Sequence, residues 1–300
     1  MTKGSRRKPK SISQGRPPTV KKPVASLSAK ATRNLIRSHH QLHKARVRAV
    51  ADGDDALVQR LDQEIAAKGG LKSYQIASKK GQSKERGGDS SHVLLQWLEP
   101  LLSQSRSEEP SSKLRVLEVG ALSSKNACSV TKALDVTRID LHSQEAGILQ
   151  QDFMERPLPG TEEEKFHIIS LSLVLNYVPD VVGRGEMLRR TVQFLTSNTQ
   201  QVSEESASSS TAGEFLPALF LVLPAACVLN SRYLTEERLD DILASLGYQL
   251  LQRKVSSKLI YYLWKYSDAE VRTKGVGYAK EIINPGPGRN NFAVVMKPSG

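Results

Sequence analysis

Residues 114–122 read LRVLEVGAL, an apolar run that ends in a carboxylate and a glycine. Such apolar runs are typical of strands that are buried on both faces of a parallel sheet. Open parallel sheets bind their ligands just outside the carboxyl ends of the strands. We therefore expect strand 114–119 to lead into a ligand-binding turn, in which Gly120 leaves room for a ligand and Glu118 receives an amino group.

Outward from this run, apolar segments alternate with helical patterns, which predicts a mostly parallel sheet covered by helices on both faces. The clearest helix follows Thr235, its predicted cap, and ends at Gly247. Residues 259–264 fit either a strand extension or a short helix. The predicted strands are 114–119, 136–141, 147–150, 166–175, 216–223 and 248–254, with a final antiparallel strand at 292–296.

Carboxylates also follow the second and third predicted strands. Asp140 lies 20 positions after Gly120, where a carboxylate accepts both ribose hydroxyls of a nucleoside. Asp152 offers an acceptor for an adenine amino group and Phe153 a ring wall, although Phe153 also fits a core position. The phosphate-binding pattern G-x-G-x-x-G is absent, because ALS follows Gly120. The pattern favours S-adenosylmethionine, which has no phosphate, over a dinucleotide, and Glu118 then faces its methionine amino group.

The fourth strand ends in the sequence SLSLVLNYVPD, residues 170–180. A substrate meets the cofactor at this end of the sheet, so Asn176, Tyr177 and Asp180 are the candidate catalytic residues. A structural alternative remains for two of them: Tyr177 packs against a helix, and Asp180 begins the next turn. Cys227 follows the fifth strand, but no base lies near it in sequence, so we do not expect it to be a nucleophile.

The positive charge of the chain is concentrated at its beginning. Residues 1–50 hold 14 Lys or Arg and no Asp or Glu, which leaves 29 basic and 31 acidic residues elsewhere. A basic arm on a near-neutral body suits binding to a polyanion such as RNA, or nuclear import. A solubilising tail and an acidic membrane surface are the alternatives.

The sequence predicts three regions. Residues 1–28 have few large apolar side chains and are predicted to be disordered. Residues 29–112 are predicted to form a helical region with a glycine-rich loop that flanks the cofactor; apolar stripes at 42–49 and 57–65 indicate a helical hairpin. Residues 113–300 form the sheet domain, with a flexible serine-rich insertion at 200–214.

Other classes of protein are not supported. The longest apolar runs are too short to span a bilayer, and the basic N-terminus has no apolar segment behind it that would make a secretory signal. Two cysteines, Cys128 and Cys227, suit a reducing compartment and form no zinc site. His39, His40 and His43 have no further ligand at suitable spacing, so we expect no metal and regard them as solvated or phosphate-facing.

The sequence closely resembles the fungal 25S ribosomal RNA adenine-N1 methyltransferase family over roughly residues 69–297. The motifs that carry the resemblance are GGLKSYQIASKKGQ, RGGDSS, LEVGALSSKNACS, RIDLHS, QQDF, SLVLNYVPD with RGEML, LPAACVLNSRY and NPGPGRNNF. The resemblance implies a class I methyltransferase (Rossmann-like) fold with a seven-stranded, mostly parallel sheet. It also implies Gly120 and Asp140 at the matched S-adenosylmethionine positions.

By the same resemblance, the protein methylates N1 of an adenine in large-subunit 25S rRNA during ribosome biogenesis, on a pre-ribosomal particle in the nucleolus. Two non-catalytic alternatives remain: a cofactor sensor that regulates a partner protein, as a metazoan relative is thought to be, and a ribosome assembly factor that binds RNA. The basic arm favours the enzyme over the sensor.

Overall fold

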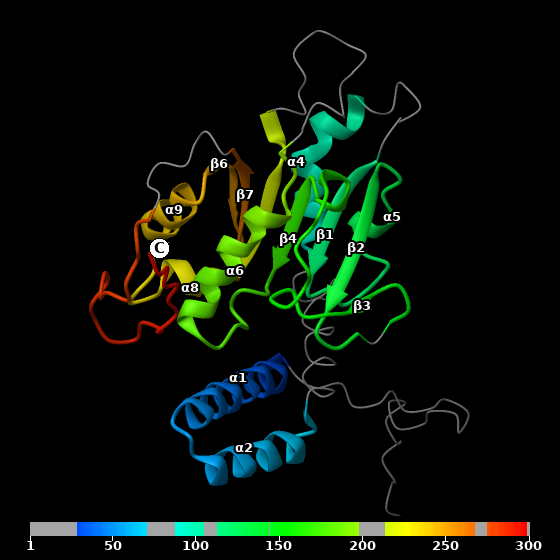
Figure 1. Ribbon diagram of the computed structural model, residues 1–300. Coiled ribbons are helices and arrows are strands. Elements are labelled where there is room, and N and C mark those ends of the chain that lie inside the picture. Colours follow the sequence, from blue (N-terminus) through cyan, green and yellow to red (C-terminus); the bar gives the residue numbers. More distant parts are fainter. Residues whose placement is uncertain are drawn as a thin grey trace, which may run out of the picture.

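Seven strands form one sheet in the computed structural model, which describes residues 29–70, 88–104, 113–143, 145–197, 214–267 and 275–298 (Figure 1). The strand order is β3-β2-β1-β4-β5-β7-β6, with β7 antiparallel to both of its neighbours and the first five strands parallel. This is the class I methyltransferase fold. The strands are β1 (Leu114–Val119), β2 (Leu134–Asp140), β3 (Leu149–Gln150), β4 (Ile168–Ser172), β5 (Ala218–Pro224), β6 (Tyr248–Val255) and β7 (Leu259–Tyr266).

Helices bury both faces of the sheet, because the central strands are apolar on both sides. In β5, Leu219 and Leu221 pack with α6 (Val181–Phe194), α8 (Ala225–Leu229) and α9 (Glu236–Ser245). Phe220 and Val222 pack on the other face with α4 (Ser91–Gln104) and α5 (Ala127–Val130). Thr235 caps α9 as predicted, and α4 continues through Pro100. This two-sided burial confirms the predicted layers.

The antiparallel strand of the sheet is not the one that the sequence predicted. It is β7, from the stretch left open as strand or helix, and it lies between β5 and β6. Residues 292–296 are not in the sheet; they pack against the start of α6, where Val295 N donates to Val181 O at 2.9 Å. Gly185 permits this approach, since a Cβ there would lie 2.0 Å from Val295 O. The prediction of a strand at 292–296 was therefore wrong.

The predicted helical hairpin is present as α1 (Ala29–Ala51) and α2 (Asp55–Ala67). It has its own small core, in which Leu42, Ala49 and Leu61 are buried. Figure 1 shows the hairpin at the end of the sheet toward which β1, β2 and β4 point. The hairpin thus lies on the side where the fold is expected to bind its ligands.

Several predictions concern residues outside the described ranges. These are the disordered arm 1–28, most of the loop 69–91 and nearly all of the insertion 200–214. Among the described residues, no helix combines the length and apolarity that crossing a membrane requires.

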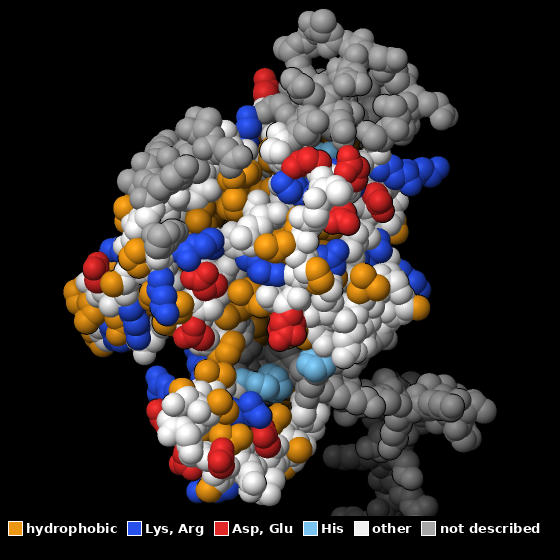
Figure 2. Space-filling view, viewed as in Figure 1, with side chains coloured by type: hydrophobic (Ala, Val, Ile, Leu, Met, Phe, Trp, Pro, Cys, Tyr) orange, Lys and Arg blue, Asp and Glu red, His pale blue; other side chains and the backbone are white. Residues whose placement is uncertain are grey.

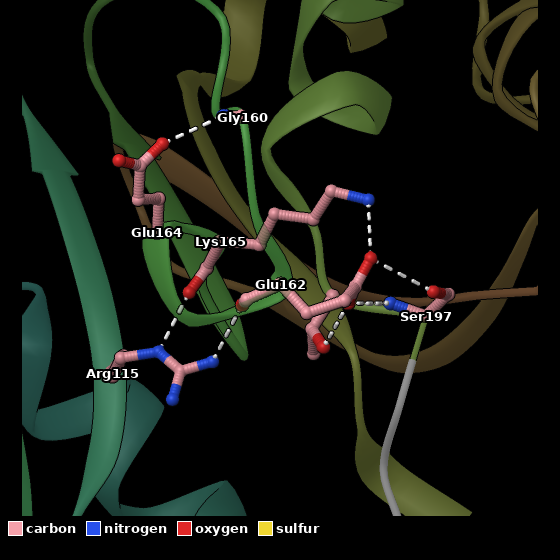
Figure 3. A network of polar contacts seen from close by, with 7 residues as sticks. Arg115, Gly160, Glu162, Glu164, Lys165 and Ser197 are labelled. Carbon is pink, nitrogen blue, oxygen red and sulfur yellow. Dashed lines mark hydrogen bonds and ion pairs between the residues drawn. The ribbon is translucent and has the colours of Figure 1, made fainter.

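A polar network stabilises the opposite, amino-terminal edge of the sheet (Figure 3). Arg115 at the start of β1 donates to Lys165 O at 2.7 Å and to Glu162 O at 3.1 Å. The Glu162 carboxylate accepts from Lys165 Nζ at 2.6 Å, from the Thr196 hydroxyl at 2.9 Å and from Ser197 N at 3.0 Å. These donors, the hydrogen bond from Lys165 first, lower the pKa of Glu162 from 4.5 to about 2. The network fixes the loop before β4 to the chain after α6.

We predict that Glu162→Gln lowers the free energy of unfolding at neutral pH. The pKa of Glu162 is depressed in the folded protein, so its stabilising effect is present above the ordinary value of 4.5 and is lost as the pH falls toward 2. Urea unfolding across this range should show the difference between wild type and variant shrinking with acidity. Glu164→Gln is the matched control, because Glu164 accepts only Gly160 N in this network. A difference that does not depend on pH contradicts the prediction.

Candidate active site

The strand order reverses beside β1, which has β2 on one side and β4 on the other. Val119 of β1 lies level with Ile139 of β2 and Leu171 of β4. The carboxyl ends of three parallel strands therefore meet here, at the topological switch point where open α/β sheets bind ligands. The residues singled out from the sequence at 118–120, 140 and 176–180 all lie along this edge.

Glu118 carries a buried carboxylate that is only half satisfied. Its Oε1 accepts from Asn126 Nδ2 at 2.7 Å, whereas its buried Oε2 has no hydrogen-bond partner among the described residues. Burial raises the pKa of Glu118 and outweighs the opposing effect of the Asn126 hydrogen bond. A buried carboxylate oxygen without a donor is costly, so the site suits a ligand that brings a positively charged donor.

Asn126 and Asp89, which the sequence analysis did not single out, hold the turn after β1 in place. Asn126 Oδ1 accepts from Ser129 N at 2.9 Å and caps α5, which orients its amide nitrogen toward Glu118. Asp89 accepts from Ala127 N at 2.6 Å and from Ser91 N at 2.9 Å, and so ties α5 to the start of α4. Polar side chains therefore stabilise a turn that lacks the usual second glycine. Both residues lie in quoted motifs, but no spacing rule indicated these partners.

Gly120 adopts a left-handed conformation, with φ +74°. A Cβ at this position would lie 2.6 Å from Val174 Cγ2, on the loop after β4. Besides the expected clearance for a ligand, a protein neighbour thus requires glycine at this position. The glycine lets the turn after β1 pack closely on the loop after β4.

The residues predicted to hold the nucleoside part of the cofactor are in different environments. Asp140 is half-buried at the end of β2, and its Oδ1 accepts from His142 N at 2.8 Å. Asp152 is also half-buried and accepts from Met154 N at 2.8 Å. The Phe153 ring is only 2% exposed and packs 5.3 Å from the Phe194 ring. Phe153 thus lies in the core, the alternative that the sequence left open, and is not part of the proposed cofactor pocket.

The loop after β4 starts with a strained residue and presents a second unsatisfied acceptor. Leu173 has φ +59°, an uncommon conformation for a residue other than glycine. Strain of this kind is typical of functional sites. Asn176 Oδ1 is buried and has no partner within the described part of the chain, and the adjacent Tyr177 is half-buried. The loop therefore places an acceptor and a ring at the carboxyl end of β4.

Asp180, the third predicted catalytic residue, is the N-cap of α6. Its Oδ2 accepts from Gly183 N at 2.6 Å. This is the structural alternative given for Asp180. The carboxylate caps the helix that begins where the loop after β4 ends, and it thereby helps to hold that loop in place.

The α1 helix brings two histidines to this edge. The His39 and His43 rings lie 4.3 Å apart, and burial, followed by the proximity of His43, lowers the pKa of His39 to about 4. Burial also lowers the pKa of His43, with further contributions from Arg46 and from His142, which follows β2. Both rings are half-buried and neutral at pH 7, so they are not fully solvated; the alternative that they face a phosphate stays a prediction. Figure 2 shows histidine side chains in the recess between the hairpin and the sheet domain.

The remaining candidates do not add to the site. Burial raises the pKa of the Cys227 thiol to about 11, which agrees with the expectation that it is not a nucleophile. No group of His, Cys, Asp or Glu suited to hold a metal ion occurs among the residues that the structure describes.

Most of the chain matches the model of one enzyme family. The family described as 25S rRNA (adenine(2142)-N(1))-methyltransferase, Bmt2, matches residues 59–294. The chain belongs to this family. It is an S-adenosylmethionine-dependent rRNA adenine-N1 methyltransferase, as the sequence resemblance implied.

Two curated members of the family align with most of this methyltransferase. The 25S rRNA adenine-N(1) methyltransferase of Schizosaccharomyces pombe is 36% identical over 264 residues, which cover 87% of this chain and 89% of that protein. The 25S rRNA (adenine(2142)-N(1))-methyltransferase of Saccharomyces cerevisiae is 40% identical over 235 residues, 78% of this chain and 62% of that protein.

The solved structures to which the chain is similar are much more distant in sequence. Magnesium protoporphyrin IX methyltransferase from Synechocystis PCC 6803 with bound S-adenosylmethionine is 12% identical, with 60% of this chain and 82% of that chain covered and a TM-score of 0.34. An O-methyltransferase family protein from Burkholderia thailandensis is 10% identical, with 81% and 74% covered and a TM-score of 0.40. The strand order, rather than these similarities, identifies the fold of this methyltransferase.

We predict that Gly120→Ala destabilises the methyltransferase and weakens its binding of S-adenosylhomocysteine. The left-handed conformation alone costs about 1–2 kcal/mol for a residue with a Cβ, and the Val174 side chain must also move. Thermal unfolding with and without S-adenosylhomocysteine measures both effects. In the Gly120→Ala/Val174→Ala double variant the contact is relieved, but the backbone strain remains. The double variant should therefore lose less stability than the two single variants together. Wild-type stability and affinity in Gly120→Ala would rule out this account of the turn.

Proposed function

We propose that this chain methylates N1 of adenine 2142 in 25S rRNA, the position in the names of its family and of its Saccharomyces cerevisiae relative. The reaction would take place at the carboxyl edge of β1, β2 and β4. The observation that carries the proposal is a pair of buried acceptors on the two sides of the switch point. Glu118 Oε2, on β1, and Asn176 Oδ1, after β4, both lack a donor among the described residues. A cofactor with an ammonium group and a base with an amino group would supply the two missing donors.

On the cofactor side, Glu118 would accept from the methionine ammonium group, and Asp140 would accept from the ribose hydroxyls. Asp152, beyond β3, would accept from the adenine amino group of the cofactor. Bound S-adenosylmethionine supplies an electrophilic methyl group on its sulfonium. The lack of a second glycine after Gly120 fits this ligand, which brings no phosphate to the turn.

On the substrate side, Asn176 and Tyr177 would hold the target adenine. Adenine carries its exocyclic amino group next to N1, so a hydrogen bond from that amino group to Asn176 Oδ1 would fix the position of N1. The ring of Tyr177 would stack on the base, which must be unpaired for N1 to be reached. N1 has its own lone pair, so the chain needs to align the base more than to remove a proton. Asn176 would also stabilise the positive charge that develops on the base, as a fixed dipole.

We further infer that the enzyme works in the nucleolus, on a pre-ribosomal particle. The support is the arm at residues 1–50, with 14 basic and no acidic residues, which suits nuclear import and RNA attachment. Fluorescence microscopy of the full chain and of a chain without residues 1–28 tests this inference; equal distribution of both through the cytoplasm would contradict it. A cofactor sensor or a non-catalytic assembly factor is disfavoured, because both relatives described above are methyltransferases.

We predict that Tyr177→Ala lowers the turnover number for 25S rRNA while leaving the affinity for S-adenosylhomocysteine nearly unchanged. Loss of base stacking removes roughly 1–3 kcal/mol of substrate alignment. Primer-extension arrest on a 25S rRNA transcript measures N1 methylation, because the added methyl blocks pairing. Tyr177→Phe keeps the ring and is the matched control, expected to retain most activity. Wild-type methylation by Tyr177→Ala overturns the role of Tyr177, and no arrest with the wild-type enzyme overturns the proposed function.

A further inference from the structure

Three cations from distant parts of the chain gather on the substrate side of the site: Lys44 on α1, Arg184 in the first turn of α6, and Lys280. We call them the basic cluster. Partial burial lowers the pKa of Lys44, and the nearby charge of Arg184 lowers it further, with smaller contributions from Arg48 and Lys280. Figure 2 shows Lys and Arg side chains on both sides of the recess between the hairpin and the sheet domain. The cluster therefore spans the junction between α1, the start of α6 and the C-terminal segment that carries Lys280.

The charge of this cluster is not neutralised by ion pairs in the described ranges of the chain. Lys44 is partly covered by neighbouring groups but keeps much of its side chain exposed, as does Lys280. The ammonium of Lys280 lies 4.5 Å from the centroid of the Tyr233 ring, over its face. Arg184 is 1% exposed, and its Nη2 is buried without an acceptor. Asp180 is a carboxylate that interacts electrostatically with Arg184, but it already caps α6. Like charges held together in this way repel one another, and a bound anion would stabilise them.

Arg184 connects the basic cluster rigidly to the proposed base pocket. Its Nε donates to Val178 O at 2.9 Å, within the loop that carries Asn176 and Tyr177. Its Nη1 donates to Ala293 O at 2.6 Å, and the guanidinium lies 4.3 Å from the centroid of the Phe292 ring. Since these contacts fix the guanidinium, its charge has a set position beside the base pocket.

We propose that the basic cluster is a subsite for an RNA backbone phosphate next to the target adenine, with Lys44 and Lys280 in contact with the phosphate and Arg184 as a fixed charge beneath them. The inference rests on the proposed placement of the adenine at Asn176 and Tyr177. A phosphate is the anion that must accompany a base entering this pocket. A bound phosphate also explains why α1 contributes a cation, Lys44, on the substrate side. On the cofactor side, the same helix carries His43, which lies near His142.

The competing anion is the carboxylate of the cofactor. The positions of the cations argue against it: the proposed methionine site is at Glu118 on β1, whereas the basic cluster adjoins Cys227, after β5. A cluster that served the cofactor would be expected nearer the turn after β1.

The test measures the salt dependence of RNA binding. The association constant for a fragment of 25S rRNA containing the target adenine is measured against potassium chloride concentration for the full-length wild type, Lys44→Met, Lys280→Met and the double variant. We expect the slope of log K against log salt to fall in magnitude with each substitution, by about one for a lost phosphate contact. KM for RNA should rise while the turnover number at saturating RNA is retained. Lys113→Met, at the amino end of β1, is the matched control and should leave the slope at the wild-type value.

Three outcomes overturn the proposal. The first is a wild-type slope in the double variant, and the second is an equal loss in Lys113→Met, which would mean that any surface lysine has the same effect. The third is weaker binding of S-adenosylhomocysteine by Lys44→Met with an unchanged RNA slope, which would assign the cluster to the cofactor carboxylate. Failure of the proposed function has a different readout: the wild-type enzyme would then produce no N1 methylation, whatever the slope of its RNA binding.

Discussion

The site depends on one buried carboxylate. Glu118 lies near the end of β1, and folding removes its Oε2 from water without providing a donor from the described residues. Such a group is unfavourable in the protein without a ligand. Its cost is limited because Asn126 donates to the other carboxylate oxygen and also caps α5, which holds the turn after β1 in place. The unsatisfied oxygen then becomes a source of affinity for a ligand that brings an ammonium group. The rest of the edge is arranged around this constraint.

Two different parts of the chain complete the edge. The loop after β4 packs so closely against the turn after β1 that Val174 occupies the space of a Cβ at residue 120. Asp180 and Arg184 hold the far end of that loop, through the cap of α6 and through the carbonyl of Val178. The hairpin covers the same edge from outside, with histidines toward the end of β2 and a lysine toward α6 and α8. One helix thus borders both the proposed cofactor pocket and the proposed RNA subsite.

Much of this arrangement follows from the sequence, and the exceptions have physical reasons. The run at 114–120 predicted the central strand and its turn, since a strand apolar on both faces must lie inside a parallel sheet. β7 was left undecided because it too is apolar on both faces, so it shows no alternation that separates a strand from a helix. Residues 292–296 are apolar because they pack on α6, not because they pair in the sheet. An apolar composition is the same in both cases, so the sequence does not separate them. The packing reason for Gly120 depends on Val174, which lies far along the chain, whereas the hydrogen bond between Asn126 and Glu118 is short-range but follows no spacing rule that a sequence shows.

The central claim is that Glu118 receives the amino group of the cofactor, and calorimetry with two ligands tests it most directly. S-adenosylhomocysteine carries that amino group, whereas methylthioadenosine keeps the nucleoside and thioether but lacks it. Glu118→Gln retains the acceptor for Asn126 and removes the charge, so its affinity for S-adenosylhomocysteine should fall by roughly ten- to hundredfold, the range for a hydrogen bond to a charged group. Its affinity for methylthioadenosine should remain at the wild-type value. Equal losses for both ligands, or no loss for either, would contradict the account.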